Sequence, residues 1–321
     1  MRISLDHLYG DALARRGLTD AAFDKRIDRS LHPRWHTMMH DKVRALGIGK
    51  GARILDVGCR DASHALEIAR RYRCHVQGID PVTHNLRKAN RLIHRHRLAS
   101  RVEVTKGRIE SIPFPSGHFD LVWCRDVLSH VRNLKAGLQE CARVLKPGGR
   151  MLLYVVFMTD RMEPRELARL CAATANARRS LSERHFRRCL RGTTLSVVER
   201  DAFGSEWREW SEEHGSKHTS RQLLRIARIL RNRKNLDRAL GPALVEAELG
   251  DCTWGVYLML GKLLGVLYVL RKTGRKLTFS AFRRTATPKA IARIHRIAVK
   301  KGLDRITDEE IRQEISAYRR R

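Results

Sequence analysis

The sequence predicts an α/β protein built around a doubly wound parallel sheet. Ile54–Asp61 has the pattern of a buried strand that ends in an acid and passes through a glycine turn into a helix beginning near Ala62. Val76–Asp80 is a second short strand that also ends in an acid. Such a strand, turn and helix N-terminus form a favourable site for a nucleotide-like ligand, and an acid after the next strand suits ribose hydroxyls.

The following segments continue the alternation of strands and helices. We expect strands at 102–104, 119–124 and 150–157, and helices at 85–98 and 134–145. Lys146-Pro147-Gly148-Gly149 supplies the residues that typically end a helix. This alternation predicts parallel strands whose carboxyl ends bind the ligand.

The composition allows a large core but is strongly basic. The chain has 321 residues, of which 42% are hydrophobic, and 65 Lys and Arg against 34 Asp and Glu give a net charge of +31. This charge favours nucleic acid or an anionic surface as a partner, whereas an arginine-rich proteome gives the same bias without any polyanion.

Cysteine usage and hydropathy indicate the cytoplasm. The seven Cys are scattered without a CxxC pair, which favours reduced thiols, and no signal-peptide pattern opens the chain. The apolar run from Trp254 to Leu270 is interrupted by Lys262, and Gly261 and Gly265 suggest a change of element within it. We therefore expect it to be core, and expect no membrane contact.

Residues 1–45 are expected to form a helical segment that covers the ligand site. His32, His36 and His40 recur at i, i+4 and i+8 on one helical face. No Cys or clustered carboxylates complete a metal site, so no metal is expected. The two remaining interpretations are a solvated face, or a lid helix whose Trp35 and His36 cover the pocket.

Five segments in order and spacing resemble the class I S-adenosylmethionine-dependent methyltransferases of small-molecule type, over roughly residues 40–160. The segments are Ile54–Asp61, Gly78–Asp80, Ile112–Pro115, Phe119–Val122 and Arg143–Gly149. The run Leu145–Gly149, coming after Phe119-Asp120, is the most specific of them.

The resemblance implies a seven-stranded Rossmann-like sheet with six parallel strands and an antiparallel last strand. Residues 46–160 would be the cofactor-binding core. The sixth strand is expected at 194–199 and the last strand at 265–270. The segment assigned to this last strand is residues 265–272.

The resemblance also implies a site for S-adenosyl-L-methionine. Asp56 and Gly58 would shape the loop around the methionine part, Asp80 would bind the ribose hydroxyls and Ile109 would pack on adenine. Cys124 and Arg125 would line the methionine side through their backbone. His130 would lie beside the transferred methyl group as a catalytic base, with His36 as the second candidate; a helix-cap or packing role is the alternative for His130. The expected cofactor contacts are completed by Cys59, Arg60, Pro81 and Arg108.

The chain departs from the family pattern at two places. Further glycines usually follow the first one in this family, but this chain has Cys59-Arg60-Asp61-Ala62-Ser63 there. Arg60 and Asp61 would therefore crowd the cofactor, unless Arg60 pairs with the cofactor's carboxylate. Arg108 stands where an acid is usual near adenine.

Residues 161–264 are expected to form a helical lid together with the sixth strand. Trp207, Trp210, Trp254 and Tyr257 would line an acceptor pocket or pack in the core. The basic amphipathic stretch 223–231 would dock a phosphate or face solvent. Helices in this region are expected at 164–176, 182–191, 206–210, 221–231, 239–249 and 254–263.

Residues 273–321 are expected to be a basic helical extension. Helical spacing between Pro288 and Lys301 and the capping box Thr307–Glu310 predict a hairpin of two helices. This hairpin would dock on the core, join two copies as a homodimer, or bind nucleic acid.

Three functional hypotheses follow. The first is methyl transfer from S-adenosylmethionine to an O, N or C nucleophile of a small molecule, in which the protein contributes mainly alignment and water exclusion. The second has the same fold acting on RNA, although Cys124-Arg125-Asp126-Val127 stands where an Asn-Pro-Pro-Tyr-like loop would be expected. The third is a cofactor-binding scaffold without catalysis.

Overall fold

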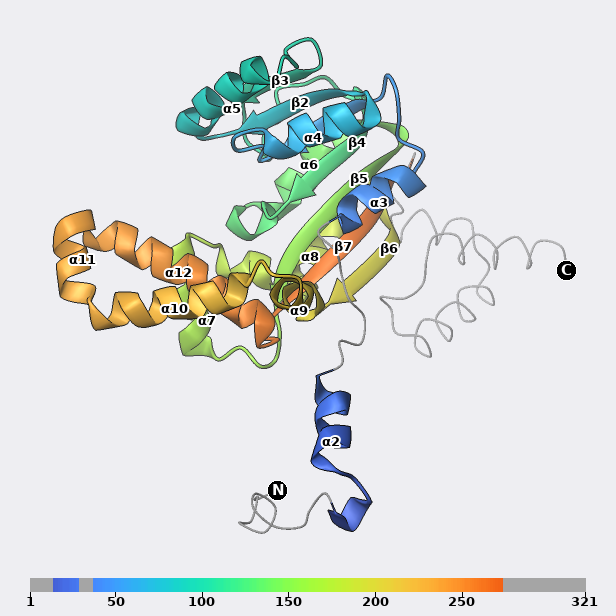
Figure 1. Cartoon of the computed structure of the whole chain (residues 1–321). Helices are drawn as coiled ribbons and strands as arrows, with labels where there is room; N and C mark the ends of the chain where they lie inside the picture. The colour runs from blue at the N-terminus through green and yellow to red at the C-terminus, as the bar shows by residue number, and fades with distance from the viewer. Residues whose placement is uncertain (1–13, 29–36, 274–321) are drawn as a thin grey trace, which may run out of the picture.

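Seven strands form one sheet in the order β3-β2-β1-β4-β5-β7-β6, in a computed structural model that describes residues 14–28 and 37–273 (Figure 1). Neighbouring strands pair in parallel, except that β7 runs antiparallel to both β5 and β6. The predicted fold class is confirmed. The strands are β1 (Arg53–Val57), β2 (His75–Asp80), β3 (Val102–Lys106), β4 (Phe119–Arg125), β5 (Leu145–Met158), β6 (Leu195–Phe203) and β7 (Leu263–Lys272).

Helices cover both faces of the sheet. Side chains of α3, α4, α5, α7 and α12 join one buried cluster, and those of α6 and α8 join the cluster on the opposite face. The α-helices are α2 (Asp20–Ile27), α3 (Met38–Ala45), α4 (Ser63–Tyr72), α5 (Thr83–Arg95), α6 (Leu134–Val144), α7 (Pro164–Thr174), α8 (Glu183–Arg191), α9 (Glu206–Glu213), α10 (His218–Arg231), α11 (Arg233–Leu240) and α12 (Pro242–Met259). Short 3₁₀ turns are η1 (Ala14–Arg16), η2 (Leu128–His130) and η3 (Arg178–Leu181).

The central strands are apolar on both faces because both faces are covered. In β4, Leu121 and Trp123 lie in the cluster beneath α3 and α4, whereas Val122 and Cys124 lie in the cluster beneath α6 and α8. This two-residue alternation is strand geometry, and double coverage explains why no polar stripe interrupts it.

Two sequence-based boundaries were wrong. Residues 239–249 and 254–263 do not form two helices, because α12 runs unbroken from Pro242 to Met259. Gly250 and Gly255 lie within it where a side chain would overlap Ala173 of α7 and Gln222 of α10, respectively. These glycines allow close helix packing and do not end the helix. The strand β5 also starts at Leu145, so it includes the residues predicted to be only a helix stop.

The apolar run after Trp254 does change element, as predicted. The helix α12 ends at Met259, Gly261 takes a positive φ of 66°, and β7 begins at Leu263. No helix within residues 14–28 and 37–273 is both long and apolar enough to cross a bilayer. The two helices predicted in the tail, one at 288–301 and one that opens at the capping box Thr307–Glu310, fall outside the described residues.

The helices that follow β5 and β6 lie at one edge of the sheet. The helix α7 follows the end of β5, and α9 follows the end of β6. The helix α12 leads into Leu263, which pairs with Met158 at the end of β5. Helices α7, α9 and α12 therefore start or end at the carboxyl edge of the parallel strands (Figure 1).

Glu183 links α8 to the last two strands. Its Oε1 accepts hydrogen bonds from Arg187 at 3.0 Å, from Nε of Arg200 at 2.8 Å and from the phenol of Tyr268 at 2.6 Å. Its Oε2 accepts a further bond from Arg200 at 2.9 Å. Burial acts to raise the pKa of Glu183, but the bonds from Arg200 and Tyr268 outweigh it and lower the pKa to about 2.

We predict that Glu183→Gln lowers the free energy of unfolding by about 1–3 kcal/mol at neutral pH, because charged hydrogen bonds to two arginines are lost. The extra stability of the wild type over this variant is fully present above the usual carboxyl pKa. It disappears as the pH falls from about 4.5 toward 2, the pKa in the folded state. Urea unfolding at pH 7 and pH 3 measures both effects. Exposed Glu213→Gln is the control, and an equal loss in that variant would contradict the assignment.

Candidate functional site

The parallel register brings the ends of β1, β2 and β4 together. Asp56 lies level with Gly78 on one side and with Trp123 on the other. Asp80 ends β2 and Arg125 ends β4. The predicted residues Asp56, Asp80 and Arg125 therefore meet at the carboxyl edge of the sheet, although 69 positions separate the first from the last in sequence.

The turn after β1 has three residues with left-handed backbone. Gly58, Arg60 and Ala62 have φ angles of 72°, 48° and 64°. Such angles cost roughly 1 kcal/mol for residues other than glycine. The family's glycine-rich conformation is therefore kept at Arg60 and Ala62 without glycine, and hydrogen bonds must hold it.

Asp80 supplies one of those hydrogen bonds. Its Oδ2 accepts from the backbone N–H of Arg60 at 3.0 Å. Its Oδ1 accepts from the backbone N–H of Val82 at 2.9 Å and from the amide of Asn85 at 3.1 Å. A carboxylate oxygen can accept two hydrogen bonds. Oδ2 therefore keeps room for one further donor, such as a ribose hydroxyl.

Asp61 does not project into the turn as a free charge. Its Oδ1 accepts from the backbone N–H of Ser63 at 3.2 Å and from the Ser63 hydroxyl at 2.7 Å. Burial acts to raise the pKa of Asp61, but these bonds to Ser63 lower it overall. The side chain of Arg60 is exposed. The expected crowding by Asp61 is thus relieved by its bond to the start of α4.

Asp56 is a buried acid that lacks a partner. It is 3% exposed, and its Oδ2 has no hydrogen-bond partner in the part of the chain that the structure describes. Burial, with a smaller contribution from Asp80, raises the pKa of Asp56 to about 8, and Arg125 acts in the opposite direction. The indole N–H of Trp123, level with Asp56 on β4, is also buried without a described partner. A buried acceptor without a donor fits a ligand that carries an ammonium group.

The two predicted site cysteines have buried side chains. Cys59 packs against Gly78, and Cys124 lies in the cluster beneath α6 and α8. Burial raises the pKa of both thiols. Neither is therefore a reactive thiolate, and only the backbone of each is suited to contact a ligand.

Arg125 lies between two aromatic groups. Its guanidinium is 3.1 Å from Nε2 of His64 and 5.4 Å from the ring centre of Trp207. Burial, followed by the nearby Arg125, lowers the pKa of His64 to about 4, so His64 is neutral at pH 7 and accepts from Arg125. Arg208, beside Trp207 on α9, donates to Oε1 of Gln222 at 3.1 Å. These four side chains, His64, Arg125, Trp207 and Arg208, are called the aromatic–arginine wall below.

His64 and Arg208 were not predicted as site residues from the sequence. The signal for His64 was its place in the first turn of the helix after the glycine turn, a position that faces the site in this fold. The signal for Arg208 was its place next to Trp207. Of the aromatics predicted for the pocket, Trp207, Trp254 and Tyr257 pack against the core, and Trp210 stacks on His214.

His130 ends the short η2 turn after β4 and is exposed. Its Nδ1 lies 3.3 Å from the backbone carbonyl of Ala175, the residue that caps α7. Since a carbonyl only accepts, Nδ1 carries the proton in this contact. With Nδ1 as the donor, Nε2 of the same ring can serve as an acceptor.

The remaining predicted residues lie around this edge. Pro81 follows β2 and is exposed. Arg108 is exposed, with its guanidinium 3.8 Å from Glu110. Ile109 is buried against Gly137 of α6, so little of its surface is available to a ligand. His36 lies outside the described residues.

His40 does not lie on a solvated face. It is buried beneath α4, with Nε2 3.2 Å from Glu67 and its ring 5.3 Å from that of Trp123. The solvated-face interpretation is therefore wrong for His40, which helps α3 cover the sheet. No group of three or more His, Cys, Asp or Glu suited to a metal ion occurs within the described ranges.

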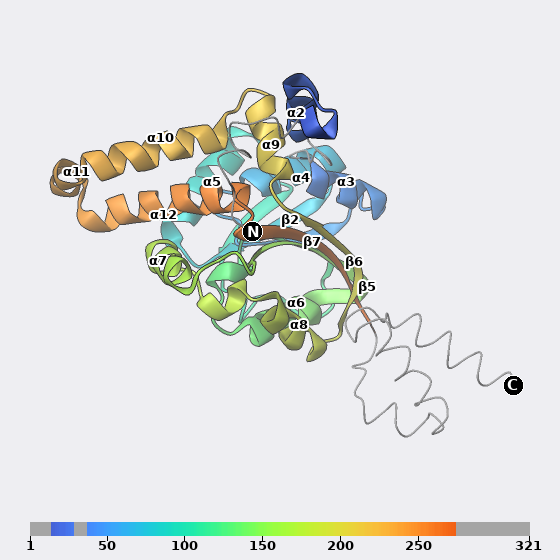
Figure 2. The same ribbon diagram turned by 90° about the horizontal axis from the view of Figure 1, so that it is seen from below.

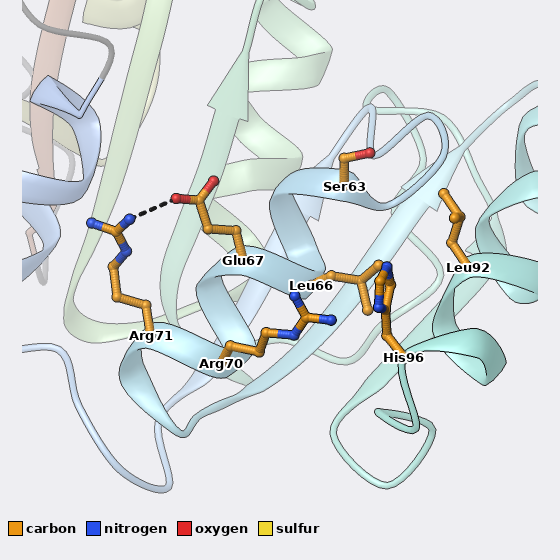
Figure 3. A pocket seen from close by; sticks show the side chains of 7 residues that line it. All are labelled: Ser63, Leu66, Glu67, Arg70, Arg71, Leu92 and His96. Atoms are coloured by element: carbon orange, nitrogen blue, oxygen red, sulfur yellow. Dashed lines mark hydrogen bonds and ion pairs between the residues drawn. The ribbon is translucent and has the colours of Figure 1, made fainter.

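A separate hollow of about 470 Å³ lies between α4 and α5 (Figure 3). Arg71 turns toward Glu67 with a 2.8 Å ion pair, whereas Leu66, Arg70 and His96 face the hollow (Figure 3). None of its lining residues is a predicted site residue, so the hollow is distinct from the carboxyl-edge site.

Comparison with known families agrees with this geometry. Residues 55–153, which run from β1 into β5, match the family described as "Methyltransferase domain". The chain carries a class I methyltransferase domain. This methyltransferase domain contains Asp56, Asp80 and Arg125, and the cofactor of such domains is S-adenosylmethionine.

Curated relatives match over the same domain. A sterol 24-C-methyltransferase of Gibberella zeae is 30% identical over 139 residues, which is 43% of this chain and 36% of the relative. The enzyme of that name from Saccharomyces cerevisiae is 32% identical over 117 residues, covering 36% of this chain and 30% of the relative. The chain thus spans about a third of the length of these relatives.

Solved structures share the fold of this chain. The geranyl diphosphate C-methyltransferase of Streptomyces coelicolor has a TM-score of 0.55 at 16% identity, covering 74% of this chain and 76% of that one. The [4+2]-cyclase SpnF has a TM-score of 0.58 at 20% identity, covering 74% of this chain and 80% of that one. Identities this low support the fold alone.

We predict that Arg60→Gly raises the free energy of unfolding by about 0.5–1 kcal/mol, because glycine takes a positive φ without strain. Denaturant unfolding measures this change. Arg70→Gly, within the right-handed helix α4, is the matched control and should lower stability by about 1 kcal/mol. A loss of stability in Arg60→Gly as well would contradict the prediction that glycine relieves backbone strain at this position.

We also predict that Asp56→Asn stabilises the protein by about 1–3 kcal/mol near pH 8, because a buried carboxylate without a partner is removed. The folded pKa of about 8 lies above the usual value of 3.8, so wild-type stability falls as the pH rises from about 4 to 8. Asn does not ionise, and the gain should therefore grow over this range.

Thermal unfolding between pH 5 and pH 8 measures that gain. Asp120→Asn is a control of opposite sign, since bonds from the Arg53 backbone and Lys146 lower the pKa of Asp120 against the effect of burial. Its carboxylate stabilises the fold at neutral pH. A pH-independent effect of Asp56→Asn would contradict the prediction.

Proposed function

We propose that the protein transfers a methyl group from S-adenosyl-L-methionine to an O, N or C nucleophile of a small molecule. The observation that carries this proposal is the pair of acids at the carboxyl edge, within a matched methyltransferase domain. Asp56 has a buried oxygen without a donor, and Asp80 has room for one more donor. These are the acceptors that an amino acid joined to a ribose requires.

The residues present fit the cofactor. Asp56 would accept from its ammonium group, Asp80 would accept from a ribose hydroxyl, and the exposed Arg60 would pair with its carboxylate. Backbone groups of Gly58, Cys59, Cys124 and Arg125 would line the methionine part. Pro81, Arg108 and Ile109 would flank the adenosine part. When bound, the cofactor supplies a methyl group already activated by its attachment to a sulfonium.

The protein then contributes orientation and a dry site. Alignment of two reactants and removal of water account for much of the rate of such a transfer. A base is needed only when the acceptor atom must lose a proton, and Nε2 of His130 is the proposed base. His36 is the second candidate.

The aromatic–arginine wall supports a proposal for the acceptor. Trp207 and neutral His64 offer apolar faces, while Arg125 and Arg208 offer charged donors. The names of similar proteins include sterol and geranyl diphosphate methyltransferases. We propose an acceptor with an apolar body and an anionic or strongly accepting group.

The cysteines support a location in the cytoplasm. All seven are free, as expected in a reducing compartment.

Two alternative functions are tested together with methyl transfer. The fold is shared with a protein named as a cyclase, so methyl transfer needs its own test. RNA methylation and a non-catalytic scaffold are outcomes of that test, and no feature of the described site favours either.

We predict that Asp80→Ala weakens binding of S-adenosylhomocysteine by about 10–100-fold, because a charged acceptor of the ribose and of the Arg60 backbone is lost. Isothermal titration calorimetry measures the affinity. His130→Ala should leave this affinity within about threefold and slow turnover by about 10²–10⁴-fold.

Glu103→Gln, an exposed change on β3, is the control for binding. Wild-type affinity retained in Asp80→Ala would refute the proposed site. Binding without turnover on any apolar acid or alcohol offered would favour the scaffold.

A further inference from the structure

The helices α10, α11 and α12 form a hairpin that extends away from the sheet. The helix α10 packs along α12, and the two-turn helix α11 joins them at the far end in both views (Figures 1 and 2). Residues 223–244, which include the end of the hairpin, are called the hairpin tip below. This segment has no part in the site described above.

Large apolar side chains are concentrated on the hairpin tip. Twelve large hydrophobic side chains are exposed among the residues that the structure describes, and five of them, all leucines, lie in these 22 positions. Their exposed fractions are 51% for Leu223, 53% for Leu224, 60% for Leu230, 56% for Leu240 and 61% for Leu244. An exposed group of this kind usually marks a contact surface.

Cations outnumber acids on the hairpin, so several of them are left without an acidic partner. Residues 218–248 contain seven Lys and Arg against three Asp and Glu. All three acids are paired, Asp237 and Glu246 with Arg233 and Glu248 with Arg225. The exposed cations Arg228, Arg231, Lys234 and Arg238 form no ion pair within the described residues.

The helix α10 separates the two kinds of side chain. Thr219, Gln222 and Ile229 are buried and face α12. Leu223 and Leu230 are seven residues apart and form a stripe beside that buried face. By helical spacing, Arg221 and Arg228 lie on the other flank of the buried face, and Leu224 and Arg231 lie opposite to Gln222. The outer face of α10 therefore carries leucines toward one flank and arginines toward the other, a combination found in helices that lie in a lipid headgroup layer.

We propose that the hairpin tip docks on an anionic lipid surface, with the leucines entering the headgroup layer and the unpaired cations contacting lipid phosphates and carboxylates. A nucleic acid would engage the cations but gives no role to five exposed leucines. A second copy would bring like charges together. The cytoplasmic leaflet offers both apolar and anionic groups. This inference departs from the expectation of no membrane contact, and it does not depend on methyl transfer.

The test is flotation of the full chain with vesicles at about 0.15 M salt, where distant charges are screened. Vesicles of phosphatidylcholine alone are compared with vesicles that contain phosphatidylserine. We expect binding to the serine-containing vesicles only. Leu230→Ser/Leu240→Ser/Leu244→Ser and Arg231→Gln/Lys234→Gln/Arg238→Gln should each weaken it at least about tenfold.

The charge-matched control is Arg87→Gln/Lys88→Gln/Arg91→Gln on α5, which removes the same charge from another exposed helix. It should change binding by less than about threefold, since the contact is local. All substituted side chains are exposed, and unchanged thermal unfolding of each variant verifies folding.

Each other result overturns the proposal. An equal loss of vesicle binding in the charge variants of the hairpin tip and of α5 would indicate attraction to net charge alone. Vesicle binding at the wild-type level by the leucine variant would show that the leucines do not contact the lipid. No vesicle binding, with a wild-type dimer that the leucine variant abolishes in light scattering, would assign the hairpin tip to a second copy. RNA binding lost only in the charge variant, without vesicle binding, would assign it to nucleic acid.

Discussion

The carboxylate of Asp80 fixes the geometry of the carboxyl edge. One of its oxygens bonds the turn after β1 through the N–H of Arg60, and the other bonds the turn after β2 through Val82 and Asn85. The two turns can therefore not move apart, although Arg60 is in a backbone conformation that arginine disfavours. Asp56 lies beneath this linked pair and has no donor, so the edge is rigid around one unsatisfied acceptor.

Scarce acids join distant elements elsewhere in the molecule as well. Glu183 links α8 with β6 and β7, Glu166 links α7 with Lys262 before β7, and Asp120 links β4 with Lys146 at the start of β5. In a chain with almost twice as many basic as acidic residues, this use leaves most of the excess cations on the surface. The net charge of +31 is thus compatible with an ordinary core and site.

The strands and their order could be anticipated because burial on both faces gives β4 and β5 continuous apolar runs, and because acids mark the ends of β1 and β2. The helix α12 could not, since the packing of Gly250 against α7 and Gly255 against α10 is a tertiary contact that sequence spacing does not show. The same holds for His64 and Arg125, which meet across 61 positions. The missing partner of Asp56 is likewise visible only once its neighbours are placed.

The junction of the insertion with β6 and β7 has a consequence for how such a fold varies. Phe203 at the end of β6 pairs directly with Gly265 near the start of β7, so the ends of the intervening segment are held side by side by the sheet itself. The sheet itself needs only a short antiparallel connection between β6 and β7. The helices α9–α12 are therefore an insertion whose two ends lie next to each other. The entropic cost of closing a loop rises only slowly with its length. Insertions of different length and surface can therefore occupy this position without changing the register of the strands.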